Sequence, residues 1–225
     1  MTILLRRGSR GALVKKLQQL LKLYPDGIFG PLTEERVIEF QRENGLTVDG
    51  IVGPSTWSRL AGVALLPKSK RVITDIIIHC TATPEGQDYT VEQIRADHKA
   101  RGFSDIGYHY IIYRDGSIHL GRNINIAGAH CKDHNSHSIG VAYVGGLEYK
   151  KGVPYKNLKA KDTRTPEQKT VLLNLLRQLR ETYPSARIKG HRDYSPDKNK
   201  NGTIEPSEWI KSCPSFDVTK ELSLL

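Results

Sequence analysis

The segment "RVITDIIIHCTAT", residues 71–83, decides the fold of the larger part of this 225-residue chain. It is a run of β-branched and apolar residues without clean alternation of apolar and polar side chains. Such a run is typical of a central strand that is covered on both faces. The run ends at His79, whose side chain could project from the end of the strand into a groove.

Two later segments carry the caps of helices. Thr90 with Gln93 in "TVEQIRADHKARG", and Thr165 with Gln168 in "TPEQKTVLLNLLRQLRETYP", have the spacing of a capping box. In the second segment leucines recur at three- and four-residue intervals, which favours a helix that packs against a core. We therefore expect two helices after the first strand.

Two further segments predict strands. The segment "YHYIIYRDGSIHLG", residues 108–121, has an Arg-Asp-Gly turn between two apolar runs and indicates a hairpin. The segment "HSIGVAYVGG", residues 137–146, indicates another buried strand. The order of elements predicts an α/β fold, in which a mixed central β-sheet is flanked by helices.

An internal repeat marks a separate domain before this fold. "DGIFGPLTE" begins at Asp26 and "DGIVGPSTW" begins at Asp49, 23 residues later. Each copy has an Asp-Gly turn, then Gly-Pro, then a threonine that can cap a helix. Apolar helical faces lie before and after the first turn, so we expect a small three-helix module in residues 1–61. Residues 62–71 contain a proline and a basic cluster and are expected to form the linker to a domain of residues 72–225.

Composition narrows the function without deciding it. The formal net charge of +10 and the pI near 9.5 indicate an anionic partner, which could be nucleic acid, a membrane surface or a phosphate-rich cell wall. We expect no nucleic acid, because basic and aromatic residues do not cluster in a strip. No apolar run approaches the roughly 20 residues of a membrane span, so we expect no membrane insertion. In "MTILLRRGSRG" the basic residues follow the apolar ones, so we expect no signal peptide.

Three residues are candidate ligands of a catalytic metal ion. His79 and His191 each lie at the end of a strand-like run, and Cys213 precedes a proline near the end of the chain. Two histidines and a cysteine are a sound ligand set for a zinc ion that keeps one position open. The spacing proves nothing by itself, and plain packing of a buried histidine or cysteine stays an alternative. A disulfide between Cys80 and Cys131 also stays open.

Longer motifs resemble known families. The segments "IIIHCTAT", "DIGYHYIIYRDGSIHLGR", "AGAHCKDHNSHSIGVAYVGG", "KGHRD" and "KSCPSFD" are similar to the zinc-dependent type 2 N-acetylmuramoyl-L-alanine amidases, which include amidase-type phage lysozymes and peptidoglycan recognition proteins. That resemblance runs from about residue 72 to 218. The segments "GALVKKLQQLL", "DGIFGPLTEERVIEFQRENGL" and "DGIVGPSTWSRL" resemble the peptidoglycan-binding domain of cell-wall hydrolases, over residues 3–60.

The resemblance implies the site residues and the reaction. It places catalytic zinc on His79, His191 and Cys213, with Tyr108 and Lys211 as catalytic side chains. The bond that it implies is the amide between N-acetylmuramic acid and the L-alanine of the stem peptide in bacterial peptidoglycan. We further expect His130 to bind substrate at the border of the cleft, with a plain polar loop as the alternative.

Three other histidines are expected to have no role in the chemistry. We expect His98 at the surface and His119 beside the neighbouring strand of its hairpin. We expect His109 to point away from a groove that Tyr108 lines, since successive residues of a strand alternate between faces.

An insertion between two of the zinc ligands, "DYSPDKNKNGTIEPSEW", has a pattern of its own. Residues 197–208 match an EF-hand-like calcium loop, with glycine at its sixth position. The expected calcium ligands are Asp197, Asn199, Asn201, Thr203, Glu205 and Glu208. The alternative is a solvated turn rich in Asn and Asp. We expect a structural clip that brings Lys211 and Cys213 back to His191.

These interpretations together predict a monomeric, modular peptidoglycan amidase. Without a leader it would be made in the cytoplasm and would reach the wall after lysis or by non-classical export, as a phage or prophage endolysin or a secreted hydrolase. The alternative is a catalytically silent peptidoglycan-recognition protein, against which the presence of both catalytic side chains argues.

Overall fold

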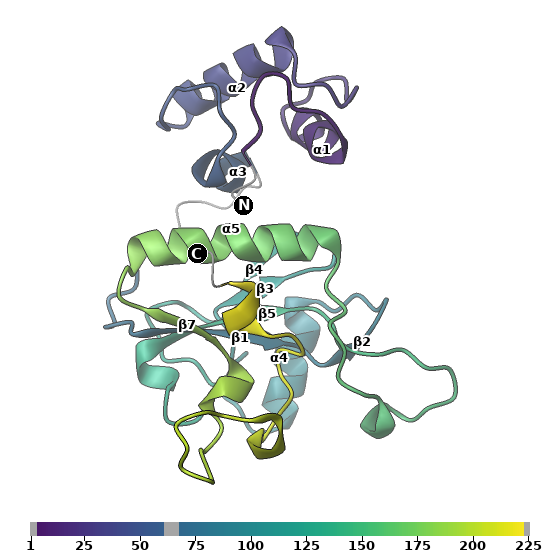
Figure 1. Cartoon of the computed structure of the whole chain (residues 1–225), viewed down its shortest axis with the longest axis vertical. Coiled ribbons are helices and arrows are strands. Elements are labelled where there is room, and N and C mark those ends of the chain that lie inside the picture. The colour runs from purple at the N-terminus through teal and green to yellow at the C-terminus, as the bar shows by residue number, and fades with distance from the viewer. Residues whose placement is uncertain (1–3, 61–67, 223–225) are drawn as a thin grey trace. The chain divides into compact units, whose positions relative to one another are not determined.

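The computed structural model describes residues 4–60 and 68–222 and divides the chain into two compact units (Figure 1). The second unit begins at Lys68. Residues 62–67 of the predicted linker lie outside the described residues. The last residues of the predicted linker are hydrogen-bonded to the rest of the second unit. The Ser69 N–H donates to the Tyr183 hydroxyl at 2.6 Å, and Arg71 Nε donates to the Ile124 carbonyl at 2.9 Å.

The first unit is the predicted three-helix module. Its helices are α1 (Ala12–Leu20), α2 (Pro31–Glu43) and α3 (Pro54–Leu60). Its buried core residues are Leu5, Val14, Leu17, Leu21, Phe29, Val37 and Val52. In α1, Val14 and Leu17 are buried, whereas Leu13 is exposed.

Two buried glutamines repeat with the period of the module. Gln18 and Gln41 lie 23 positions apart and are 2% and 1% exposed. Each donates from Nε2 to the aspartate of its turn, at 2.7 Å to Asp26 and 2.8 Å to Asp49. Each also accepts, at Oε1, the N–H of the glycine after that aspartate at 2.9 Å. The glutamines therefore fix both copies of the Asp-Gly turn, since a buried amide group must have its hydrogen bonds made.

The second unit has a five-stranded mixed sheet, which confirms the predicted fold class. The order of its strands is β4 (Ile118–Leu120), β3 (Tyr110–Ile112), β5 (Ser138–Tyr143), β1 (Asp75–Cys80) and β7 (Arg187–Gly190). β1 pairs in parallel with both β5 and β7, β3 pairs in parallel with β5, and β3 with β4 forms the antiparallel hairpin. Every residue of β1 is buried, as its unbroken apolar run predicts. A separate parallel pair joins β2 (Thr83–Pro84) to β6 (Gly146–Leu147).

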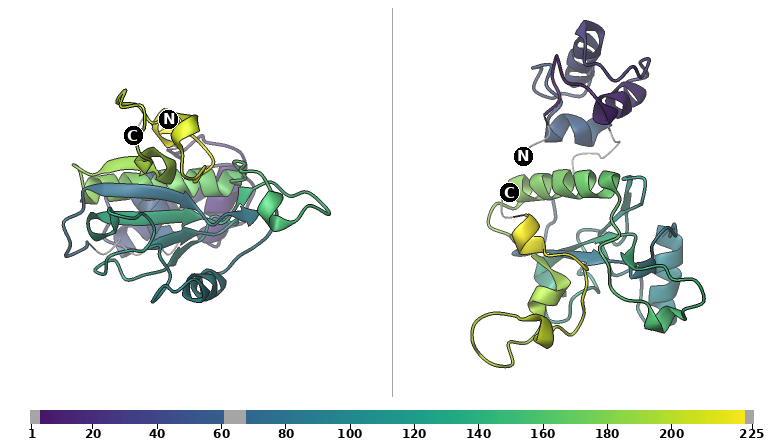
Figure 2. Two further views of the ribbon diagram at one scale, coloured as in Figure 1. Left: turned by 90° about the horizontal axis from the view of Figure 1, so that it is seen from below. Right: turned by 45° about the vertical axis from the view of Figure 1, so that its right-hand side comes forward.

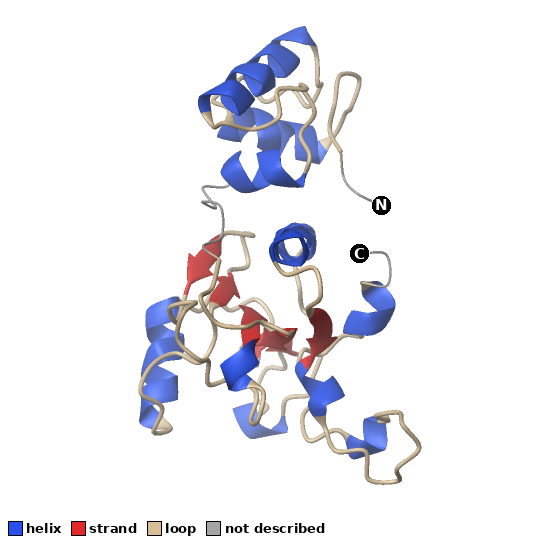
Figure 3. Ribbon diagram, turned by 90° about the vertical axis from the view of Figure 1, so that its left-hand side faces the viewer, coloured by secondary structure: helices blue, strands red, loops and turns tan. Residues whose placement is uncertain are grey.

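Helices cover both faces of this sheet (Figures 1 and 3). The helix α5 (Pro166–Thr182) lies along one face and α4 (Val91–Ala100) lies on the other; the left view of Figure 2 looks across the strands toward α5. Both helices begin with the predicted capping boxes. Shorter helices are η1 (Asn135–His137), η2 (Tyr155–Asn157), η3 (His191–Tyr194), η4 (Pro206–Glu208) and α6 (Val218–Glu221). Among the described residues, the helices are too short or too polar for a membrane span.

Candidate metal centre

Three segments bring the predicted zinc ligands together. His79 is the penultimate residue of β1, and His191 directly follows β7. Because β1 and β7 are parallel and Ile78 pairs with Gly190, the two histidines leave the sheet at the same edge. The Arg192 N–H donates to the Cys213 carbonyl at 2.8 Å and so holds the C-terminal segment beside η3.

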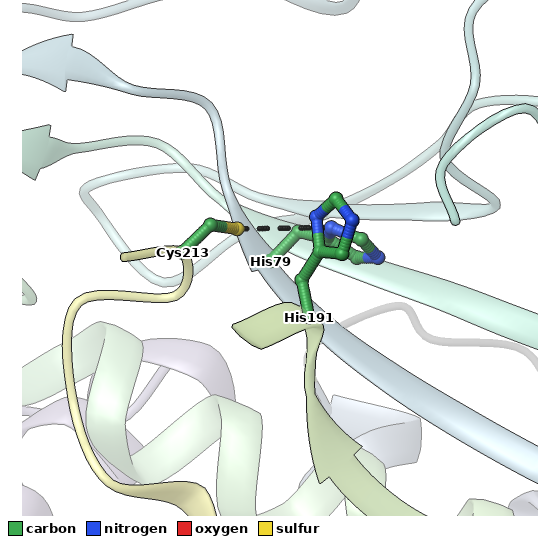
Figure 4. Close-up of side chains that lie close together, drawn as sticks. All are labelled: His79, His191 and Cys213. Atoms are coloured by element: carbon green, nitrogen blue, oxygen red, sulfur yellow. Dashed lines mark hydrogen bonds between the residues drawn. The ribbon is translucent and has the colours of Figure 1, made fainter. Parts of the chain in front are cut away.

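The three side chains point toward one another in Figure 4, and their ligand atoms all lie within 4.8 Å of one another. Cys213 Sγ lies 3.7 Å from His79 Nδ1. A tetrahedral zinc ion with ordinary bonds of about 2.3 Å to sulfur and 2.0–2.1 Å to nitrogen separates those two atoms by about 3.6 Å. The donor set and its spacing therefore fit a zinc ion.

The protonation of the three groups also suits a cation. Burial lowers the pKa of His79 well below its usual value and the pKa of His191 to about 4, so both imidazoles are neutral at pH 7. Burial raises the pKa of the Cys213 thiol. A divalent cation would stabilise the thiolate, and the Cys80 N–H already donates to Cys213 Sγ at 3.3 Å.

His130 lies directly behind His79. It is 8% exposed, and its Nδ1 lies 3.0 Å from His79 Nε2. If Nδ1 of His79 binds the metal ion, Nε2 of His79 carries the hydrogen and can donate it to His130. His130 Nε2 in turn lies 3.3 Å from the Ser138 hydroxyl. Such outer contacts orient a metal-binding imidazole; the substrate contact expected of His130 stays a prediction.

Tyr108 and Lys211 both lie near the three ligands. The Tyr108 ring centroid is 5.2 Å from that of His79. Burial raises the pKa of Tyr108, so its hydroxyl is protonated and can donate a hydrogen bond at neutral pH. Lys211 is exposed, and after burial its positive charge is the next cause that lowers the pKa of His191. The arrangement can therefore supply two hydrogen-bond donors beside a bound cation.

The structure corrects one expectation about the other histidines and agrees with another. His98, expected at the surface, is 5% exposed and accepts the Gly107 N–H at 2.8 Å. It shares the buried face of α4, four residues after Ile94, a spacing that could have revealed it. His119 stacks on Tyr113 of the hairpin at 3.7 Å between ring centroids, as a cross-strand side chain should. His109 is buried and accepts the Gly140 N–H of β5, and its ring centroid lies 5.7 Å from that of His130. Its expected orientation away from the groove of Tyr108 stays a prediction.

All three cysteines are free thiols, so Cys80 and Cys131 do not form the disulfide that the sequence left open.

A pocket of about 410 Å³ is lined by residues that include Thr81, two positions after His79 in sequence. Its lining includes Thr81, Thr83, Tyr89, Tyr149 and Tyr155. Part of the pocket lining thus follows His79 closely in sequence, and the lining offers aromatic rings and hydroxyl groups.

The insertion at residues 197–208 forms a loop closed by its own hydrogen bonds. Asp197 Oδ2 accepts the Gly202 N–H at 2.8 Å, and Glu208 Oε1 accepts the Lys198 N–H at 2.7 Å. The Asn199 side-chain amide donates to Glu205 at 3.2 Å. These hydrogen bonds order part of the loop by themselves.

Two family models match the chain. The N-acetylmuramoyl-L-alanine amidase model matches residues 69–207, more than half of the chain, and a peptidoglycan binding domain model matches residues 10–60. The chain belongs to the N-acetylmuramoyl-L-alanine amidase family. The family match supports amidase activity on peptidoglycan, and the chain carries an N-terminal peptidoglycan-binding domain.

Curated relatives include phage enzymes and animal proteins. The amidase is 40% identical to the endolysin of Enterobacteria phage K11 over 147 residues, which cover 65% of this chain and 83% of that protein. It is 37% identical to the endolysin of Escherichia phage T7, over 67% of this chain and 87% of that protein. It is 33% identical to a peptidoglycan-recognition protein of Drosophila melanogaster, over 65% of this chain and 78% of that protein. Among solved structures, the amidase LysC from Clostridium intestinale is 28% identical and covers 68% of this chain and 87% of its own, with a TM-score of 0.49.

Proposed function

We propose that this amidase is an active zinc enzyme that cleaves the bond between N-acetylmuramic acid and L-alanine, with zinc on His79, His191 and Cys213. The observation that carries the proposal is the 3.7 Å separation of Cys213 Sγ and His79 Nδ1, with His191 beside them. That separation suits a tetrahedral ion, and three protein ligands would leave its fourth position to water or substrate.

Bound zinc would polarise the scissile carbonyl and lower the pKa of a water molecule toward neutrality. The chain's own residues supply the rest. The Tyr108 hydroxyl and the Lys211 ammonium would donate to the oxygen on which negative charge develops during amide hydrolysis. His130 would keep the hydrogen of His79 on Nε2 and hold the imidazole in the orientation that binds metal.

Turnover distinguishes this function from silent recognition of peptidoglycan. A recognition protein needs a groove but no hydrogen-bond donors for a developing charge, whereas both Tyr108 and Lys211 are present here. The pocket that begins at Thr81 would hold a part of the substrate next to the cleaved bond.

The test is digestion of purified peptidoglycan followed by mass spectrometry. We expect free stem peptides that begin with L-alanine, together with intact glycan strands. Tyr108→Phe and Lys211→Met should each lower the rate by about 10²-fold or more, the usual effect of removing such a donor, while zinc content stays unchanged. The matched control is His119→Gln, an imidazole away from the centre, which should keep full activity. Glycan fragments, or full activity in both donor variants, would contradict the proposal.

The first unit would hold the enzyme on the wall, where the excess of positive charge suits anionic wall polymers. The similarity to phage endolysins supports a role in host lysis, in which the enzyme is made in the cytoplasm and reaches the wall when the cell is lysed. The anchoring role can be tested by measuring how much protein sediments together with intact wall. The whole chain should sediment with the wall more than a chain without residues 1–61.

We also propose that the loop of residues 197–208 binds calcium as a structural ion. The support is the register of its oxygen-bearing residues, with Gly202 at a positive φ of 84° where the EF-hand loop requires its turn. Calcium titration at saturating zinc should raise the melting temperature of the wild type and leave the Glu208→Gln variant unaffected. An equal response of the two proteins, or none in the wild type, would contradict calcium binding here.

A further inference from the structure

The strand β1 has a second group of metal-ligating side chains at its other end. β1 begins at Asp75, four residues before the zinc ligand His79. One ligand atom each from Asp75, His134 and His137 lie within 4.8 Å of one another, the same spacing that holds for the three residues of the metal centre. We propose that this group, the Asp75 cluster, binds a second divalent transition metal ion of the zinc type.

The local fold explains why these three residues meet. His134 precedes η1 and His137 is its last residue. Residues three apart in a 3₁₀ turn lie on the same side, and the two rings have a centroid separation of 5.5 Å. His137 Nε2 lies 3.7 Å from Asp75 Oδ2. Asp75 pairs in register with Ser138, directly after η1, so the sheet itself brings the carboxylate to the two imidazoles.

One atom of the cluster lacks a partner. In the described part of the chain, His134 Nδ1 is buried and has no hydrogen-bond partner. A buried polar atom left without a hydrogen bond is unfavourable, so native proteins rarely leave one. A cation bound between Nδ1 of His134, His137 and Asp75 would satisfy that atom.

The chemistry of the cluster selects the class of ion. Two imidazoles and one carboxylate are a known set for zinc and other borderline divalent metals, and they leave coordination positions for water. The absence of a thiolate from these three residues distinguishes the cluster from the centre with Cys213. His137 keeps 35% of its side chain exposed, so an ion can enter from solvent.

Asp75 already has other partners, and these set the expected affinity. Its carboxylate is fully buried and accepts hydrogen bonds from Thr74 at 2.7 Å, from Tyr194 at 2.7 Å, and from Arg187 at 2.9 and 3.1 Å. Burial opposes ionisation, but these hydrogen bonds hold the pKa of Asp75 below its usual value, so a carboxylate is present at neutral pH. The Arg187 side chain is 61% exposed and can move aside. Because an ion must compete with this guanidinium, we expect weaker binding than at the metal centre.

The location indicates a structural ion. Asp75 and His79 lie at opposite ends of one strand, so an ion on the cluster cannot reach a bond that is cleaved at the metal centre. It would instead tie the segment before β5 to β1. Loss of this ion should therefore leave the amidase reaction intact.

Metal stoichiometry tests the proposal independently of activity. After equilibrium dialysis against zinc, the wild type should hold two ions per chain by mass spectrometry of the metal. Cys213→Ser should hold one, and the double variant His134→Ala/His137→Ala should also hold one while it still cleaves the wall. His119→Ala, which removes an imidazole outside both sites, should hold two. One ion in the wild type, or two in the double variant, would overturn the second site.

Cobalt supplies a second measurement that separates the two sites. Co²⁺ bound to Cys213→Ser should give visible d–d bands without a thiolate-to-cobalt charge-transfer band, since the remaining ligands have no sulfur. The single substitution His137→Gln in that background, at a partly exposed position, should abolish those bands even where the double variant fails to fold. Bands of unchanged intensity in that variant would show that the ion lies elsewhere and would refute the proposal.

Discussion

Arg164, in the segment before α5, contacts the segment that carries Cys213, and its replacement by methionine tests that connection. The guanidinium is 1% exposed and hydrogen bonds Asp162 at 2.8 and 2.9 Å and Glu221 at 2.7 and 3.0 Å. It also lies 3.2 Å from the centroid of the Phe216 ring. Phe216 and Glu221 follow Cys213 in sequence, so this one side chain holds the C-terminal segment in place.

The expected loss follows from these contacts. A charge-assisted hydrogen bond contributes about 1.5–3 kcal/mol, and a desolvated cation–π contact contributes up to about 2 kcal/mol. The contribution of Glu221 must be discounted because its side chain is 44% exposed and solvent screens it. Methionine keeps much of the apolar packing. We therefore expect Arg164→Met to lower the free energy of unfolding by about 2–4 kcal/mol, which lowers the melting temperature of a unit of this size by about 4–16 °C.

Tryptophan fluorescence can measure this change in the second unit alone. The chain has two tryptophans, of which Trp57 is in the first unit and Trp209 in the second. In a Trp57→Phe background, thermal and urea unfolding followed by Trp209 reports the amidase unit. The matched control is Lys169→Met, which removes a 3.8 Å pair to the same Asp162 from an exposed position and should cost less than about 0.5 kcal/mol. Equal effects of the two substitutions would refute the reasoning.

Three further changes test other parts of the structure. Gln41→Leu should destabilise the first unit by about 2–4 kcal/mol, since it leaves the Asp49 carboxylate, the Ile51 carbonyl and the Gly50 N–H without their hydrogen bonds to Gln41. Glu43→Gln on the exposed face should not destabilise it. Unfolding followed by Trp57 fluorescence measures both variants, and equal unfolding curves would contradict the role of Gln41. Burial lowers the pKa of His98 to about 4, below the unfolded value of about 6.5, so the unfolded chain binds more protons between these values and stability falls as pH falls through that window. His98→Gln should lower the dependence of the free energy of unfolding on pH by up to about 1.4 kcal/mol per pH unit. Urea unfolding between pH 7 and pH 5 measures this dependence in both proteins, and the same dependence in the variant as in the wild type would contradict the prediction. Gly140→Ala should weaken zinc binding by about 10–100-fold, because a Cβ there would lie 2.6 Å from Cδ2 of His130 and would displace the His130 ring from His79. Competition with a chelating dye measures the zinc affinity, and an unchanged affinity would argue against His130 as an orienting residue.

Local patterns predicted the elements of the fold well. The apolar run of β1, the capping boxes of α4 and α5, and the repeated Asp-Gly turns all depend on residues that are near one another in sequence. Each was found where the sequence predicted it. Such signals are strong because a cap or a buried strand is decided mostly within about ten residues.

Features that depend on distant contacts were harder to predict. Gln18 and Gln41 look like surface residues in sequence, although their common distance of eight residues before each turn aspartate could have marked them. His98 was placed at the surface because the face of a helix that packs on a sheet is known only once the sheet is placed. The three residues of the Asp75 cluster are brought together by the pairing of β1 with β5, which the spacing of residues does not show.

The three proposed zinc ligands rest on the resemblance, and packing explains why their residue spacing alone cannot assign them. His79 and His191 meet because β1 and β7 are parallel neighbours, although 112 residues separate them in sequence. Two hydrogen bonds to backbone carbonyls hold Cys213 beside them. The Arg192 N–H donates to the Cys213 carbonyl, and the Tyr143 hydroxyl donates to the Pro214 carbonyl at 2.7 Å.

A crystal structure of the zinc-loaded protein, with diffraction data collected on both sides of the zinc absorption edge, tests the central claim most directly. We predict an anomalous peak within bonding distance of His79 Nδ1, a ring nitrogen of His191 and Cys213 Sγ, and its loss in Cys213→Ser together with loss of wall cleavage. A fully active protein with no zinc peak at these three residues would contradict it.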